Sequence, residues 1–122
     1  MLIEVILYEY LKGLFFDDDI PVYMERPEKR PSGSYIIIEK TGSTKVNKIP
    51  TATFAFQSYG DTLYEASDLN DRVKSAVEMA EYMSDVISGV TLNSDYNFTD
   101  TASKSYRYQA VFAITYYEQG RK

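Results

Sequence analysis

The clearest pattern along the chain is an alternating apolar strand that leads through a turn into a long amphipathic segment. Within residues 52–59 the apolar side chains of Ala52, Phe54 and Phe56 fall on one face, and Thr53, Ala55 and Gln57 fall on the other. This period is typical of a strand with one buried face. Gly60-Asp61 follows and predicts a turn.

The segment after that turn has the features of an amphipathic helix. Thr62 is a favourable N-cap, and Glu65 stands three residues later, so the two form a capping box. Apolar side chains then recur at steps of three or four residues: Leu63, Ala66, Leu69, Val73, Ala76, Val77, Ala80 and Met83. Polar and charged residues fill most of the other positions, so we expect one long helix over residues 63–83 with an apolar stripe.

Five other segments complete the predicted sheet and its second helix. Residues 2–12 are rich in apolar residues and predict a buried helix that ends at Gly13, with Phe15 and Phe16 returning to the core. Pro21 confines the short strand 20–25 to an edge, whereas strand 35–41 is apolar on both faces and therefore central. We expect an irregular strand over residues 90–98 and a long one over 105–118.

The connections differ in character. Residues 26–33 contain two prolines and predict a loop, and residues 41–48 are polar and predict a flexible hairpin loop. Residues 119–122 predict a loose tail. The order of helix, three strands, long helix and two strands favours an α+β fold in which residues 1–122 form one domain. We expect two layers, with a mostly antiparallel sheet of about four to five strands and two helices packed on one face.

Composition excludes much catalytic chemistry. The chain has no cysteine and no histidine, so thiolate and imidazole nucleophiles, bases and metal ligands are absent. Asp17-Asp18-Asp19 offers a carboxylate metal site as one interpretation, but adjacent residues rarely point at one ion, and a solvated turn is favoured. We therefore predict no catalytic, cofactor-binding or metal site.

The start of the chain carries Glu4 and Glu9 within its apolar run and resembles no signal peptide. No apolar run reaches the roughly 20 residues that a membrane span needs. We expect a protein that is made and folded in a cytoplasm.

Charge is unevenly distributed along this chain, whose net charge is −5. Residues 25–48 hold six basic and three acidic residues, a net of +3, whereas residues 61–100 hold two basic and nine acidic residues, a net of −7. Two solvated segments of different charge are the simplest interpretation. The alternative is a head-to-tail contact in which the basic segment of one copy meets the acidic helix of the next, and a head-to-tail contact that closes makes a ring.

Twelve tyrosines and no tryptophan leave two interpretations open. The tyrosines could form aromatic cross-strand pairs in a sheet, or half-buried positions at an interface. A third idea, stacking of Tyr106 and Tyr108 on single-stranded nucleic acid, has only Arg107 as a basic neighbour. The net negative charge also disfavours general nucleic-acid binding.

The layout of the chain resembles a family of small structural proteins. The matching segments are the N-terminal helix, Ile20-Pro21-Val22-Tyr23, Tyr35-Ile36-Ile37-Ile38-Glu39, and Phe54-Ala55-Phe56-Gln57-Ser58-Tyr59-Gly60-Asp61-Thr62-Leu63-Tyr64-Glu65-Ala66 before the long helix and the last strand. Together they span nearly the whole chain. In order and length they resemble the tail terminators, or tail-completion (head–tail joining) proteins, of long-tailed bacteriophages and prophages.

This resemblance implies a structural virion protein without a catalytic site or a cofactor. Such proteins form a ring, usually a hexamer, on the end of the tail tube. The ring stops tube polymerisation and gives the head-completion or connector protein a docking surface, and DNA passes through its bore without specific binding. The implied partners are therefore other copies of the chain, the tail tube protein and the connector, with no membrane. The protein would be made in the bacterial host cytoplasm and reside in the virion, at the head–tail junction.

On this basis we predict two complementary surfaces. The basic loop would supply a subunit-contact or docking loop through Lys40, Lys45, Asn47 and Lys48. The long helix would supply the complementary acidic face through Asp68, Asp71, Glu78 and Glu81. The alternative function is an acidic, soluble protein-binding module, such as an inhibitor that mimics DNA or an immunity-like protein.

Overall fold

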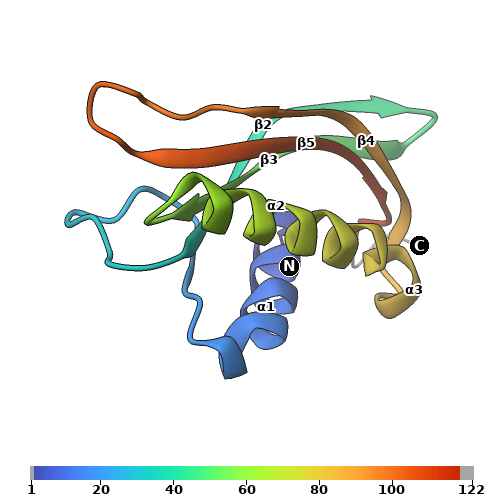
Figure 1. Ribbon diagram of the computed structural model, residues 1–122. Coiled ribbons are helices and arrows are strands. Elements are labelled where there is room, and N and C mark those ends of the chain that lie inside the picture. The colour runs from blue at the N-terminus through green and yellow to red at the C-terminus, as the bar shows by residue number, and fades with distance from the viewer. Residues whose placement is uncertain (1, 119–122) are drawn as a thin grey trace.

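The computed structural model describes residues 2–118 and has a two-layer α+β architecture, as predicted. Its elements are α1 (Ile3–Phe15), the 3₁₀ helix η1 (Phe16–Asp18), β1 (Val22–Tyr23), β2 (Tyr35–Val46), β3 (Ile49–Gly60), α2 (Leu63–Glu78), α3 (Ala80–Met83), β4 (Ile87–Asn97) and β5 (Tyr106–Tyr116). The helices cover one face of the sheet and leave the other face without a helix (Figure 1). The predicted tail, 119–122, lies outside the described residues.

The sheet has the strand order β1-β2-β3-β5-β4. Its pairs are antiparallel except β1–β2, which is parallel. The two-residue strand β1 is at an edge, as Pro21 predicted. Residues 24–34, between β1 and β2, contain no helix or strand, which confirms the predicted loop.

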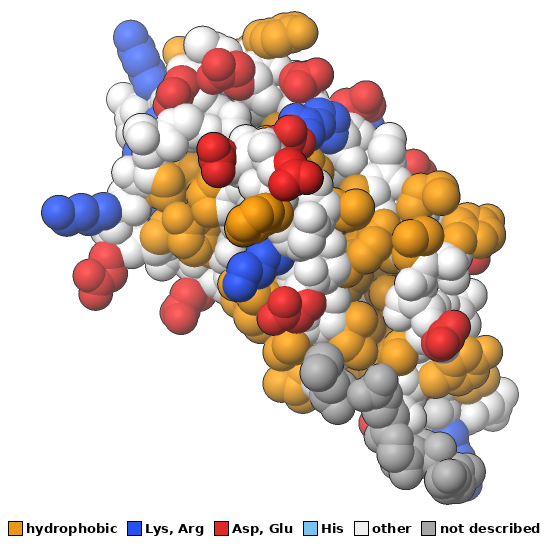
Figure 2. Space-filling model, turned by 90° about the horizontal axis from the view of Figure 1, so that it is seen from below, with side chains coloured by type: hydrophobic (Ala, Val, Ile, Leu, Met, Phe, Trp, Pro, Cys, Tyr) orange, Lys and Arg blue, Asp and Glu red, His pale blue; other side chains and the backbone are white. Residues whose placement is uncertain are grey.

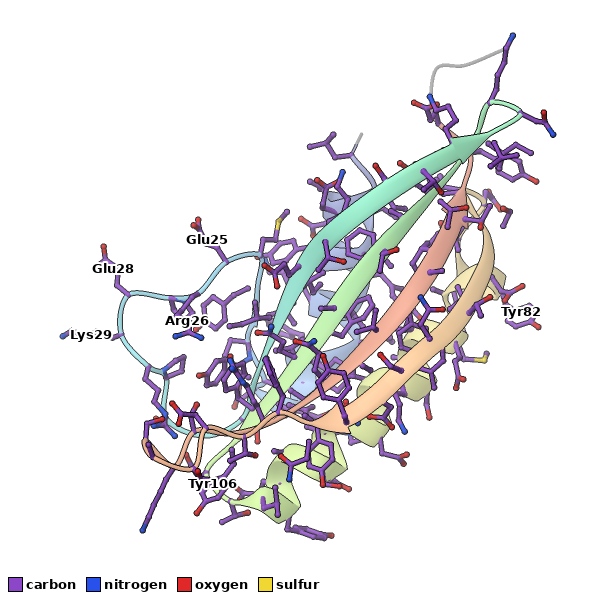
Figure 3. The ribbon with its side chains drawn as sticks, turned by 90° about the horizontal axis from the view of Figure 1, so that it is seen from above. Glu25, Arg26, Glu28, Lys29, Tyr82 and Tyr106 are labelled. Atoms are coloured by element: carbon purple, nitrogen blue, oxygen red, sulfur yellow. The ribbon has the colours of Figure 1, made fainter. Side chains whose placement is uncertain are left out.

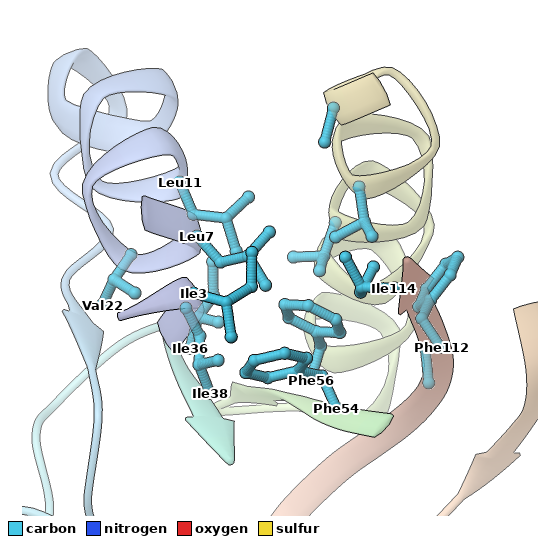
Figure 4. Packing of buried hydrophobic residues seen from close by; sticks show 14 of the residues in the cluster. Ile3, Leu7, Leu11, Val22, Ile36, Ile38, Phe54, Phe56, Phe112 and Ile114 are labelled. Carbon is cyan, nitrogen blue, oxygen red and sulfur yellow. The ribbon is translucent and has the colours of Figure 1, made fainter. Parts of the chain in front are cut away.

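The core lies between the helices and the sheet (Figure 4). Helix α1 buries Ile3, Leu7, Leu11 and Phe15, which are spaced four residues apart and so line one face. The predicted stripe of α2 is buried at Ala66, Leu69, Val73 and Val77. The sheet contributes alternate side chains from its middle strands, namely Ile36, Ile38, Ala52, Phe54, Phe56, Ala110, Phe112 and Ile114. Two distant parts of the chain meet here, since the rings of Phe56 and Phe112 pack edge to face at 5.7 Å.

The turn before α2 has nearly the predicted capping. The Glu65 amide donates to the Thr62 hydroxyl at 3.1 Å, which confirms the N-cap. The Glu65 carboxylate, however, accepts from the amide of Asp61 at 3.1 Å, one residue before the N-cap. Both ends of the turn are thereby tied to the first turn of the helix.

Both helices differ from prediction at their C-terminal ends. The single helix expected over residues 63–83 is interrupted at Met79, where the amide still bonds to Ser75 but the short α3 begins a new turn. Because of this break Ala80 stays buried while Met83 is 67% exposed. Helix α1 continues past Gly13 to Phe15, because Phe15 extends the buried stripe by one more turn, and Phe16 is 72% exposed rather than in the core.

The segment expected to be a flexible loop, residues 41–48, is instead the end of a β-hairpin. Strand β2 runs to Val46 and β3 begins at Ile49, so only Asn47 and Lys48 form the turn. Both have positive φ, 52° and 67°, as in the type I′ turns whose twist matches that of paired strands. The polar composition suggested a loop, but polar residues suit an arm that projects beyond the helices.

Candidate interaction surfaces

The face of the sheet opposite the helices carries a continuous polar network. The register places Gln57 opposite Gln109 and Tyr59 opposite Arg107, with all four side chains on this open face. Arg107 Nη1 donates to the Tyr59 hydroxyl at 2.7 Å, and that hydroxyl donates to Gln57 Oε1 at 3.2 Å. Gln57 Nε2 donates to Gln109 Oε1 at 2.9 Å, and Gln109 Nε2 donates to the Tyr96 hydroxyl. The network therefore links three strands and holds Arg107 in place.

Aromatic rings gather at the Arg107 end of this network. Tyr35 and Tyr59 stack with ring centroids 4.4 Å apart and planes 6° apart, and Tyr23 meets Tyr35 edge to face at 6.1 Å. The Arg107 guanidinium lies 4.3 Å from the centroid of the Phe98 ring and 5.6 Å from that of Tyr59. These contacts combine cation–π attraction with hydrogen bonding.

Two arginines of the loop 24–34 join this end of the sheet. Arg30 donates to the backbone carbonyl of Lys104 at 3.1 Å, which ties the loop to the β4–β5 connection. A surface pocket of about 300 Å³ opens between the two segments and is lined by Arg26, Pro27, Glu28, Arg30, Tyr35, Tyr59, Ser103 and Ser105. In Figure 3 Arg26 lies on the inner side of the loop, whereas Glu25, Glu28 and Lys29 point away from the sheet.

We call Tyr23, Tyr35, Tyr59, Arg26, Arg30 and Arg107 the tyrosine–arginine cluster. Burial is the main cause that raises the pKa of Tyr35, and nearby Tyr59 adds to it, while the charges of Arg30, Arg26 and Arg107 act in the opposite direction. All three arginines thus act electrostatically on one ring. Within residues 2–118 no carboxylate oxygen lies within 4.0 Å of these guanidinium groups. Within the described residues the three arginines therefore form no ion pair, and the cluster presents positive charge.

Helix α2 presents the opposite charge on the other side of the molecule. Asp68, Asp71 and Glu78 are exposed and recur at helical spacing along its outer side, and Glu81 in α3 is half-buried. Figure 2 shows acidic side chains spread over this helical face, with fewer basic ones among them. We call Asp68, Asp71 and Glu78 the acidic stripe.

The basic residues of α2 are bound to other acidic groups. Arg72 forms an ion pair with Asp18, and Lys74 forms one with Asp95 at 2.5 Å. The hydrogen bond with Asp95 is the main cause that raises the pKa of Lys74. No ion pair involving the acidic stripe occurs in the described part of the chain, although Lys74 interacts electrostatically with Asp71 and Glu78.

The structure places the predicted docking residues on the hairpin, where their roles differ. Lys40 pairs with Glu4 at 3.4 Å and Lys45 pairs with Glu118 at 2.7 Å, so both lysines make contacts within the subunit. Asn47 and Lys48 form the exposed turn. Apolar side chains flank that turn, since Val46 is 68% and Ile49 46% exposed.

Sequence reasoning missed the tyrosine–arginine cluster because its members come from four separate segments. Arg107 alternates with Tyr106 and Tyr108 along β5, so these two tyrosines lie on the helical face and cannot stack beside it. The useful signal was the pairing of β3 with β5, which brings Tyr59 beside Arg107. Neither strand reveals that pairing by itself.

The acidic run at residues 17–19 does not form a metal site with other acidic residues in the described part of the chain. Among residues 2–118 no group of three or more acidic side chains is placed to hold a metal ion. Asp17, Asp18 and Asp19 are exposed in a tight turn, and Asp18 is turned toward Arg72. No helix within residues 2–118 is long and apolar enough to cross a membrane.

Comparison with protein families and with curated proteins finds no relative of this chain. No protein-family model matches this chain, and no curated protein matches it either. Functional inference therefore rests on the geometry of the two charged surfaces and on the layout of the chain.

Proposed function

We propose that this protein is a structural ring-forming protein of a long-tailed phage or prophage, of the tail-terminator type. The observation that carries the proposal is a pair of oppositely charged surfaces, the tyrosine–arginine cluster and the acidic stripe, on opposite faces of one small α+β unit. Surfaces that complement each other but face apart favour head-to-tail association, and such association makes closed rings when the rotation fits.

Other features agree with a structural role. Tyr and Arg are enriched at the cores of protein interfaces, and both are concentrated at one end of the open face. The net charge of −5 disfavours contacts with phosphate, as suits a ring through which DNA passes without specific binding. In this proposal the ring sits on the end of the tail tube, stops its polymerisation and offers a surface to the connector of the filled head. Its place is the head–tail junction of the virion, after synthesis in the bacterial host cytoplasm.

The first test is the native mass of the purified protein, measured by light scattering behind size exclusion over a wide concentration range. A ring of the expected kind has about six times the subunit mass of 14.0 kDa. The second test adds the protein to growing tail tubes of the phage or prophage whose genome carries this chain. Capped tubes of limited length, seen by electron microscopy, would support the proposal. Tubes that grow on unchanged, with no protein at their ends, would refute it.

The second candidate is an acidic binding module that imitates DNA or acts as an immunity-like partner. The acidic stripe favours it, because exposed carboxylates spaced along a rigid helix can imitate a row of phosphates. This candidate predicts a monomer or dimer that binds a basic protein tightly and ignores tail tubes. Native mass and tube capping therefore separate the two candidates.

A further inference from the structure

We propose that the tyrosine–arginine cluster of one copy binds the acidic stripe on α2 of the next copy. The inference rests on the proposed ring and adds the two surfaces that hold it together. It also moves the basic side of the contact away from Lys40 and Lys45, since both are already paired within their own subunit.

The two surfaces are complementary in charge. Arg26 and Arg30 are exposed, and with Arg107 they have no carboxylate partner within residues 2–118. The stripe carboxylates form no ion pair in the same described part, and Lys74, which acts on Asp71 and Glu78 through space, is itself hydrogen-bonded to Asp95. Guanidinium groups bind carboxylates in a two-pronged geometry that holds partners in register. The lysine of the same loop, Lys29, points outward and serves as a comparison (Figure 3).

Tyrosine side chains accompany each charged set. Tyr64 and Tyr82 lie at the two ends of the stripe and are 78% and 75% exposed. Tyr64, Asp68, Asp71, Ser75 and Glu78 follow one another at steps of three or four, so they share one side of α2, and Tyr82 lies beyond the break at Met79, in α3. The cluster likewise surrounds its arginines with the Tyr35–Tyr59 stack. Exposed tyrosines beside charged groups give a contact both area and direction.

The two surfaces also lie on different faces of the subunit. Tyr59 and Arg107 of the cluster lie on the open face of the sheet, whereas α2, which carries the stripe, covers the other face, so the two surfaces cannot meet within one subunit (Figure 1). A single neighbour that covers the cluster leaves its own cluster free for the next copy. The contact is therefore heterologous and repeats around a ring.

The test reverses the charge of each surface in turn. The variant Arg26→Glu/Arg30→Glu makes the cluster acidic, and Asp68→Arg/Glu78→Arg makes the stripe basic. Each variant alone should raise the concentration needed for assembly by roughly 100-fold, because like charges then face each other. Arg107 is left intact because it holds the network of the open face together.

A one-to-one mixture of the two variants is the decisive sample. In the mixture the acidic cluster of one variant faces the basic stripe of the other, and the two unaltered surfaces face each other at the next contact. The two variants should therefore alternate around the ring and restore assembly to near the unaltered level. The control Lys12→Glu/Lys29→Glu changes the same number of charges outside the cluster and should assemble normally. Circular dichroism checks that every variant is folded.

The outcomes separate this inference from the proposed function. A ring that forms equally well with both charge-reversed variants overturns the inference and leaves the ring intact, as does loss of assembly that the mixture does not restore. A protein that neither self-assembles nor caps tail tubes, even unaltered, refutes the proposed function instead. Binding of a short fluorescent DNA duplex that Arg26→Glu/Arg30→Glu abolishes without affecting ring mass would assign the cluster to phosphate and also overturn the inference.

Discussion

Two glycines show how local space decides the effect of the same substitution. A Cβ added at Gly60 would lie 2.6 Å from the amide nitrogen of Ala66 and 2.8 Å from Glu65 Cβ, because the strand end packs directly on the start of α2. Gly13 is exposed in the last turn of α1, and a Cβ there meets nothing within 4 Å. A side chain at position 60 therefore requires the backbone to shift, whereas a side chain at position 13 does not.

We therefore expect Gly60→Ala to lower the free energy of unfolding by about 1–3 kcal/mol through a forced backbone shift. Gly13→Ala should raise it by about 0.5–1 kcal/mol through the better helix propensity of alanine. Urea unfolding of both variants beside the unaltered protein measures the difference. Equal shifts in the same direction would contradict the close approach of β3 and α2 at Gly60.

Tyr10 gives a prediction about pH. Its hydroxyl donates to the backbone carbonyl of Ala76 at 2.7 Å and so joins α1 to α2, and burial raises its pKa. Because the pKa of Tyr10 is higher in the folded state than in the unfolded chain, its contribution to the free energy of unfolding is complete below about pH 10. That contribution is lost as the pH rises through the folded-state pKa. Tyr10→Phe should cost about 1 kcal/mol near neutral pH, and the difference should shrink above about pH 10.

Urea midpoints of the unaltered protein and Tyr10→Phe at about pH 8 and about pH 11 measure this. The control is Tyr82→Phe, which removes a hydroxyl from a side chain that is 75% exposed and should leave the midpoint unchanged at about pH 8. A Tyr10→Phe deficit that stays constant across the alkaline range would show that the hydroxyl is not protected by burial.

At the scale of the element, the hairpin turn is the clearest source of backbone strain. Lys48 has a φ of 67°, a left-handed conformation that costs a residue with a side chain about 1–2 kcal/mol relative to glycine. Lys48→Gly should therefore stabilise the protein by about 1 kcal/mol, since Asn-Gly is the preferred pair for this turn. Thermal unfolding measures the shift. Lys48→Ala removes the charge but keeps the strain, so a gain from both variants would point to charge rather than conformation.

The same hairpin shows what could be predicted from the sequence. Alternation in residues 52–59 and the stripe from Ala66 to Val77 depend on near neighbours, and both were correct. The arm was wrongly predicted as a loop because strand pairing, not local propensity, extends β2 to Val46. The break at Met79 was missed because the apolar period continues through it.

The candidate surfaces follow the same distinction. The acidic stripe lies on one helix, so spacing alone located its residues. The tyrosine–arginine cluster needs the β3–β5 register and the folding of the loop 24–34 onto the sheet, neither of which has a local signal. Two lysines of the predicted docking loop, Lys40 and Lys45, form ion pairs with Glu4 and Glu118. These partners are far away in the sequence, so no local pattern reveals them.

At the scale of the whole molecule, salt distinguishes a charged contact from an apolar one. The distance over which charges interact falls from about 8 Å at physiological salt to about 3 Å at 1 M. If the tyrosine–arginine cluster and the acidic stripe hold the ring, its assembly should weaken steadily as sodium chloride rises, while circular dichroism of the subunit stays unchanged. The exposed apolar pair at the hairpin tip, Val46 and Ile49, offers the competing contact. A ring held by that pair would keep its mass or gain stability in salt, so a mass that does not fall would exclude the charged contact as its main source of stability.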